Sequence, residues 1–289
     1  MLTAVVEPIP VLDLFADLHD RLLELLRSLS PDEWQRPTVC SRWKVKDIAA
    51  HLLDGDLRRL SAQRDGYRTP DAPDGFASHQ ELVAYLDALN STWTRAAARL
   101  SPRVLIELLA LAHPQVIELY RSLDPFGPAI YPVGWAGESG STNWFDIARE
   151  YTERWHHQAQ IRLAVDQPGD LLARRFYRPL LETFLRALPY TFREVQRPEG
   201  TVVTVAIVDE QAGRVTDEWS VVLRDGSWEL CAGTTPEPAG LAVIPDTVAW
   251  RVFTKRSTCE AALSQYPAIR LSGDLELAGR VLEMISIMA

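Results

Sequence analysis

The residues of this chain with the clearest chemical potential are Glu153 and His157, four positions apart in the segment AREYTERWHHQAQI at residues 148–161. The segment is typical of a helix, and a spacing of four places both side chains on one helical face. A carboxylate beside an imidazole supplies two of the three protein ligands that a catalytic zinc or iron ion needs. A third candidate is His51, in the amphipathic segment at residues 45–60. Together the three residues predict a 2-His-1-carboxylate metal site inside a helical bundle.

Each of these candidates has a competing interpretation. A single histidine on an apolar helix face is more often a core residue than a ligand, and this applies to His51 taken alone. Glutamate is almost never fully buried unless it is paired or metal-bound, yet Glu153 shares a stripe with Ile161 that should face the core. Glu150 is a competing carboxylate one turn earlier. His156 is a competing imidazole about 100° around the helix, where we expect it to point outward or to pack at an edge.

Other chemistries have weaker support in the sequence. There is no G-x-S-x-G motif, no Walker loop and no G-x-G-x-x-G motif after a strand. Cys40 precedes a helix whose N-terminus would lower the thiol pKa, but a nucleophilic role is the minority interpretation. Of the remaining histidines, we expect His19 to be exposed and His113 to be structural.

Composition narrows the class of protein. The 289 residues suffice for two ordinary domains, and 47% of them are hydrophobic, which allows a sizeable core in each. The net charge of −9 disfavours a general nucleic-acid binder. Three widely spaced cysteines and an N-terminus without secretory features predict a cytoplasmic protein. No apolar run approaches a membrane span, so we expect no membrane partner.

Helical periodicity dominates the first two-thirds of the chain. It predicts helices over residues 11–26, 45–63, 81–100, 102–121, 144–165 and 171–192. The loop at residues 124–142 is rich in Pro, Gly and Ser and long enough to be functional. It carries Trp135, which we expect either to line a pocket mouth and contact substrate or to anchor the loop.

The pattern changes near residue 198. Short β-branched runs predict strands near residues 202–207, 219–223, 228–231, 241–244 and 269–271. Asp225-Gly226 predicts a hairpin, and helices are expected at residues 246–253 and 275–288. The predicted class is therefore α+β with two domains: a four-helix bundle at residues 1–198 and a small α+β domain at residues 199–289.

Two groups of segments resemble a known family. In the helical region they are EW at 33–34, RPTVC at 36–40, WKVKDIAAHL at 43–52 and the E-x-x-x-H helix with its trailing Gln160-Ile161. These segments resemble the DinB-like four-helix-bundle family, in its mycothiol-dependent maleylpyruvate isomerase branch. In the C-terminal region AWRVFT at 249–254 and LSGD at 271–274 are similar to the sterol-carrier-protein-like domain that follows this bundle. The resemblance covers nearly the whole chain.

The resemblance implies a cofactor and a reaction type. It implies that His51, Glu153 and His157 bind zinc, with iron or nickel as alternatives, and leave a position open for a low-molecular-weight thiol, mycothiol in actinobacteria. The thiolate would add to a small electrophile, giving isomerisation if it is expelled and S-transfer if it stays. Gln160 occupies a position where many relatives have Asp, which argues against maleylpyruvate as the substrate. Arg251 is a candidate to bind an anionic group or to form a salt bridge.

Three functions remain open at this point. The first is a thiol-dependent isomerase or S-transferase that acts on a small electrophile. The second is a non-haem iron oxygenase, because the same triad is an iron-binding facial triad. The third is a non-catalytic protein whose C-terminal domain holds an apolar ligand. In each case we expect a monomer or homodimer with no nucleic-acid partner.

Overall fold

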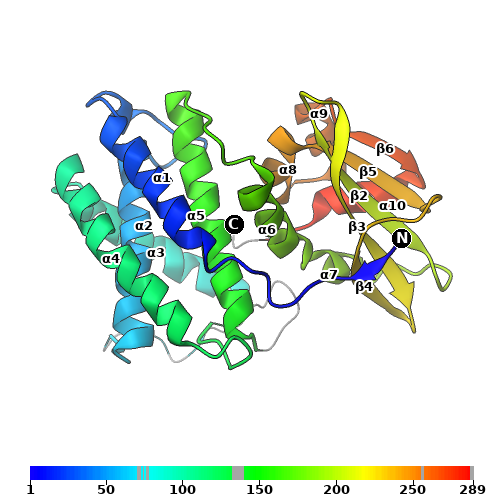
Figure 1. Ribbon diagram of the computed structural model, residues 1–289, viewed down its shortest axis with the longest axis horizontal. Coiled ribbons are helices and arrows are strands. Elements are labelled where there is room, and N and C mark those ends of the chain that lie inside the picture. Colours follow the sequence, from blue (N-terminus) through cyan, green and yellow to red (C-terminus); the bar gives the residue numbers. More distant parts are fainter. Residues whose placement is uncertain (70–72, 74, 76–77, 132–139, 255–256, 287–289) are drawn as a thin grey trace. The chain divides into compact units, whose positions relative to one another are not determined.

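The computed structural model describes residues 1–69, 73, 75, 78–131, 140–254 and 257–286. The chain forms two compact units. We name them the helical unit, which comprises Pro10–Tyr131 and Ser141–Phe176, and the sheet unit, which comprises Met1–Ile9 and the chain from Tyr177 onward. The predicted α+β class, with a helical N-terminal part and a sheet-containing C-terminal part, is confirmed (Figure 1).

The helices of the helical unit follow the predicted segments closely. They are α1 (Leu14–Ser28), α2 (Val45–Arg59), α3 (His79–Ala97), α4 (Pro102–Ser122) and α5 (Asn143–Val165), with a short turn η1 (Glu33–Gln35) after α1 and a π turn η2 (Leu60–Arg64) that extends α2. Local chemistry sets the ends of these helices. At the start of α4, the Ser101 hydroxyl accepts a hydrogen bond from the Val104 amide at 3.3 Å. At the end of α5, Asp166 adopts a left-handed conformation with φ of 58°.

Helices α1, α2, α4 and α5 pack together as a four-helix bundle, with α3 beside α2 (Figure 1). Their facing side chains are apolar, and at most 2% of the surface is exposed for Phe15, Leu18, Ile48, Leu105, Leu109 and Ile161. Most helices of a bundle bury one face and expose the other, but in α5 all residues from 154 to 161 are buried. The polar side chains of this stretch therefore need partners inside the unit.

In the described part of the sheet unit, six strands form one sheet in the order β1-β4-β3-β2-β5-β6. They are β1 (Thr3–Ala4), β2 (Val202–Asp209), β3 (Arg214–Arg224), β4 (Ser227–Ala232), β5 (Gly240–Pro245) and β6 (Arg270–Gly273). Neighbours are antiparallel except β2 and β5, which are parallel. The predicted β3–β4 hairpin is present, and it turns at Asp225 and Gly226 with φ of 48° and 76°.

The remaining helices are α6 (Arg174–Leu185), α7 (Leu188–Phe192), α8 (Asp246–Phe253), α9 (Cys259–Gln265) and α10 (Leu275–Arg280), followed by the turn η4 (Val281–Glu283). Helices α8 and α10 pack against β2 and β5, and α7 packs against β4. The division between the two units falls within α6, after Phe176. The domain boundary expected near residue 198 stays a prediction, which truncation of the chain would test.

Two helix predictions in this region are wrong, and one helix was not predicted. The single helix expected over residues 171–192 is split into α6 and α7, because Pro189 has no amide proton for the Leu185 carbonyl and its ring would clash with that carbonyl in a continuous helix. Helix α9 was not expected from its short periodic segment. The helix expected over residues 275–288 ends at Arg280 and continues only as the turn η4. The side chains of Val281, Leu282 and Met284 are buried without further α-helix, so tertiary packing outweighs helix propensity here.

Candidate metal centre

The helical unit brings together the three predicted ligands, His51 from α2 and Glu153 and His157 from α5. Glu153 Oε1 lies 2.9 Å from His51 Nε2 and 3.1 Å from His157 Nε2. One ligand atom from each residue lies within 4.8 Å of the others. The helical repeat aligns Glu153 with His157, whereas the packing of α2 against α5 brings in His51. We call these three residues the metal centre.

The metal centre is closed on its histidine side and open on its glutamate side. The His51 and His157 side chains are each 10% exposed, while the Glu153 side chain is 41% exposed. Trp43 covers the two imidazoles, with ring centroids 4.7 Å from His51 and 5.8 Å from His157. The sequence did not single out Trp43 as a site residue, because it lies in a loop where no periodicity indicates side-chain direction.

Gln160 supports His157 from behind. Its side-chain oxygen lies 2.8 Å from His157 Nδ1, and its side-chain nitrogen lies 2.7 Å from His156 Nε2. His156 was expected to point outward or to pack at an edge, but it is buried within the unit because α5 is covered all round at this level. Burial and, to a smaller extent, the neighbouring His157 lower the pKa of His156 to about 3, so the ring is neutral at ordinary pH.

Hydrogen bonding indicates the protonation that the metal centre favours. An ionised carboxylate only accepts, so both imidazoles direct a protonated Nε2 toward Glu153. Burial lowers the pKa of His51 and favours its neutral form. Burial also opposes a charge on His157, but the Glu153 carboxylate outweighs it and raises the pKa of His157. Burial likewise opposes the charge of Glu153, yet the two imidazoles hold the pKa of that carboxyl well below its usual range.

The competing carboxylate, Glu150, is engaged elsewhere. Its Oε1 lies 2.7 Å from Arg59 Nη2. The same guanidinium is buried and pairs with both oxygens of Asp146, at 2.5 and 3.0 Å. Glu150 and Glu153 differ by one helical turn, but only Glu153 faces the two imidazoles.

The residues of the metal centre fit a divalent transition-metal ion. Two imidazole nitrogens and one carboxylate oxygen are a donor set suited to zinc, iron or nickel. The Nε2 atoms of His51 and His157 converge on one carboxylate oxygen, so an ion could exchange with the protons that they now direct toward it. Three protein ligands with one open side are typical of a catalytic rather than a structural ion.

A second polar cluster lies in the core of the same bundle, with one residue from each bundle helix. It consists of His19 (α1), Asp56 (α2), His113 (α4) and Arg154 (α5), all at most 6% exposed. Asp56 pairs with Arg154 and lies 3.1 Å from His113 Nδ1, and the His19 and His113 rings stack at 4.3 Å. The expectation that His19 is exposed is therefore wrong, because α1 turns it toward α4. We call this set the core cluster.

The other predicted site residues belong to neither cluster. Arg251 lies in α8 of the sheet unit, where its guanidinium stacks 5.3 Å from the Trp250 ring, and a role in substrate binding stays a prediction. Trp135 lies outside the described residues. Burial raises the pKa of the Cys40 thiol, which makes it a poorer nucleophile.

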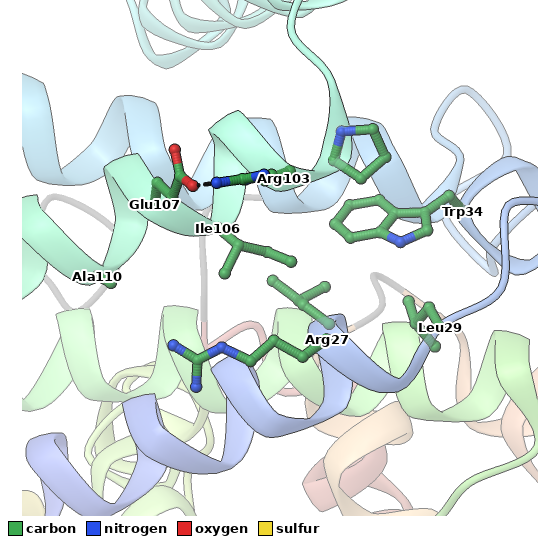
Figure 2. A pocket seen from close by; sticks show the side chains of 9 residues that line it. Arg27, Leu29, Trp34, Arg103, Ile106, Glu107 and Ala110 are labelled. Carbon is green, nitrogen blue, oxygen red and sulfur yellow. Dashed lines mark hydrogen bonds and ion pairs between the residues drawn. The ribbon is translucent and has the colours of Figure 1, made fainter.

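A groove of about 510 Å³ lies elsewhere on the helical unit, between α1, η1 and α4 (Figure 2). Apolar side chains such as Leu29, Trp34 and Ile106 line it, and an Arg103–Glu107 ion pair of 2.8 Å spans one turn of α4 at its edge. Its described lining contains no histidine, cysteine or hydroxyl side chain. The one carboxylate of this lining, Glu107, is paired with Arg103, so the groove offers fewer groups for chemistry than the metal centre does.

The chain is similar to known proteins. The family model of the mycothiol maleylpyruvate isomerase N-terminal domain matches residues 15–162. The chain is similar to the crystal structure of the mycothiol-dependent maleylpyruvate isomerase, with a TM-score of 0.49 and 13% identity over 87% of this chain and 89% of that chain. For a histidine-to-alanine mutant of that enzyme the TM-score is 0.47 and the identity 12%, with the same coverage. No curated protein matches the sequence.

The matched residues include every member of the metal centre, from His51 on α2 to His157 on α5. They also extend over just over half of the chain, which is enough to assign a family. In agreement with the resemblance of its sequence, the chain belongs to an enzyme family, that of the mycothiol maleylpyruvate isomerase N-terminal domain.

Proposed function

We propose that this protein is a metal-dependent enzyme that uses a low-molecular-weight thiol, such as mycothiol, to isomerise a small electrophile or to form an S-conjugate with it. The observation that supports this most is the convergence of His51, Glu153 and His157 with one side open to solvent. Membership of the mycothiol maleylpyruvate isomerase family supports the thiol as cosubstrate.

In this proposal the three residues of the metal centre hold zinc, with iron or nickel as alternatives. A bound zinc ion would supply the positive charge that keeps a thiol ionised near neutral pH. The protein contributes one carboxylate and two imidazoles, so its ligands only partly offset the charge of a divalent ion. The bound ion would therefore keep a net positive charge and would attract a further anionic ligand, such as a thiolate.

The surrounding residues would control approach to the metal centre. Trp43 excludes water from the imidazole side, so the thiol would enter past the exposed Glu153 side chain. For the electrophile, we retain Arg251 as the candidate group for an anionic substituent, since guanidinium pairs bidentately with carboxylate. Gln160 in place of an acidic residue favours a substrate other than maleylpyruvate.

The test combines metal analysis with thiol-dependent turnover. Protein purified without added metal would be analysed for bound ions, then assayed against maleylpyruvate and other small electrophiles with and without thiol. We expect about one zinc ion per chain and turnover that requires thiol. Both should be lost in Glu153→Gln. Glu150→Gln is the matched control, because it makes the same change one helical turn away on a carboxylate that Arg59 holds.

The rival functions predict different results in the same experiment. Bound iron with oxygen consumption would indicate an oxygenase on the same triad. No metal and no turnover, with uptake of an apolar ligand, would indicate a binding protein. Native mass spectrometry with and without thiol would add the oligomeric state, for which a monomer or homodimer stays a prediction. No helix in the described parts of the chain has the length and apolar character needed to cross a bilayer, and a cytoplasmic location also stays a prediction.

A further inference from the structure

The side-chain amide of Gln160 lies between two histidine rings of its own helix. Its oxygen lies 2.8 Å from His157 Nδ1 and its nitrogen 2.7 Å from His156 Nε2. All three side chains are buried, so water cannot readily replace either hydrogen bond. The spacings of three and four residues place the three groups on adjoining parts of one helical turn.

The orientation of this amide determines which nitrogen of His157 is available to a ligand. With the oxygen toward His157, Nδ1 must carry a proton, and a neutral ring then has its lone pair on Nε2, the atom that faces Glu153. With the amide reversed, its NH₂ group would need a lone pair on Nδ1. The proton would then lie on Nε2 and block ligation there.

His156 links the orientation of the amide to the tautomer of a second ring. An amide alone can rotate by half a turn and exchange its oxygen with its nitrogen at little cost. Here the NH₂ group donates to His156 Nε2, which accepts only if that nitrogen carries a lone pair. A reversed amide would require both histidines to change tautomer together inside a buried network.

The second histidine of the metal centre has no such support. His51 Nδ1 is buried without a hydrogen-bond partner among the described residues. Its ring is covered instead by Trp43, whose contact constrains the plane of the imidazole but not its tautomer. Before an ion binds, a hydrogen bond at Nδ1 therefore constrains the tautomer of His157 but not that of His51.

We propose that Gln160 is the positioning residue of the metal centre: its amide, which also contacts His156, keeps the proton on Nδ1 of His157, so that Nε2 is the atom that gives up its proton when an ion binds. This inference rests on the proposed function, in which His157 is a metal ligand. Gln160 does not touch the ion or the substrate. It acts through His157, as hydrogen-bond partners of metal-binding histidines commonly do.

The experiment compares variants of the full chain by zinc affinity and by the imidazole ¹⁵N signals of His157. Gln160→Leu removes both hydrogen bonds and should weaken zinc binding about 10- to 100-fold. Gln160→Glu keeps an oxygen for His157 Nδ1 and should restore most of that affinity. Gln158→Leu is the matched control, a buried glutamine on the same helix whose amide meets α1 at Leu18 and Leu22. It should affect stability without changing zinc affinity.

The NMR measurement separates this inference from the proposed function. In the parent chain the Nδ1–H signal of His157 should be present and slow to exchange, and in Gln160→Leu it should be lost or shifted. Equal zinc affinity and equal His157 signals in the two proteins would overturn the inference. Failure of the parent chain to bind zinc, iron or nickel would overturn the proposed function, and the role of Gln160 in setting the tautomer would then be decided by the His157 signal alone.

Discussion

The metal centre and the core cluster use similar residues in the same bundle, yet they have different properties. Both draw on helices α2 and α5, and Glu153 of the first is adjacent in sequence to Arg154 of the second. Each contains two histidines and one carboxylate. They differ in the partner of that carboxylate: Asp56 pairs with a guanidinium, whereas Glu153 pairs, among the described residues, with imidazoles.

Solvent access follows the same division. The core cluster is closed on every side, and a buried carboxylate there depends on the permanent charge of Arg154. In the metal centre, part of the Glu153 side chain is exposed. A metal ion could replace the Nε2 protons of the two imidazoles, which would be released to solvent. Histidine and carboxylate in contact are thus not sufficient for a functional site. An open side and exchangeable positive charge distinguish the metal centre.

The largest effect is expected on removal of a ligand from the metal centre. His157→Ala should weaken zinc binding at least about a thousandfold, roughly 4 kcal/mol, because it deletes one of three donors. Helical circular dichroism should be unchanged, since the bundle core consists mainly of Leu, Ile and Ala side chains. Chelator competition measures the affinity. Loss of helicity when metal is removed from the parent chain would contradict this and indicate a structural ion.

The neighbouring residue should show the opposite behaviour. Arg154→Met should lower the free energy of unfolding by about 3–5 kcal/mol, because it leaves the buried Asp56 carboxylate without its counter-charge. Adding Asp56→Asn should recover part of this loss. Denaturant unfolding measures both variants. A small stability change for Arg154→Met, comparable to that of Glu153→Gln, would remove the distinction drawn between the two clusters.

Acid should destabilise the bundle through the core cluster. Burial, with a further contribution from His113, lowers the pKa of His19 from 6.5 to about 2. Between these values the unfolded chain binds a proton at His19 that the folded chain does not, so stability falls as pH falls below 6.5. From about pH 7 to about pH 5 the loss from His19 should be about 2 kcal/mol.

The control for this pH effect is His19→Leu, which cannot titrate. The difference in unfolding free energy between the parent chain and this variant should change with pH by the amount given above. Because other groups titrate equally in both proteins, the subtraction isolates His19. A difference that does not vary with pH would mean that His19 has the same pKa in the folded and the unfolded chain.

The smallest effect on metal binding is expected at Glu150. Glu150→Gln should leave zinc affinity unchanged, because Arg59 and not the metal centre holds that carboxylate. It should cost about 1 kcal/mol of stability through the weakened hydrogen bond to Arg59. Isothermal titration with zinc measures the first quantity and denaturant unfolding the second. A large loss of affinity would mean that Glu150 belongs to the metal centre.

Local features of this protein were readable from its sequence. The i, i+4 relation of Glu153 and His157, the Ser101 cap and the Asp225-Gly226 hairpin depend on residues within one or two turns of each other, so spacing and residue type predict them. The α+β class followed from the change of period near residue 198. The split of α6 from α7 was also local, and Pro189 was its available but unused signal.

The choice of partner for each polar side chain was decided only by tertiary structure. Glu150 and Glu153 lie roughly 60° apart on one helix, and periodicity alone does not tell which of them meets an imidazole from α2. The burial of His19 and His156 has the same origin, because α5 is surrounded on all sides and α1 turns its histidine toward α4. Such contacts join residues up to about a hundred positions apart, as in the His51–Glu153 pair, whose separation is 102. They depend on how whole helices pack, and the position of Trp43 over the metal centre is set in the same way.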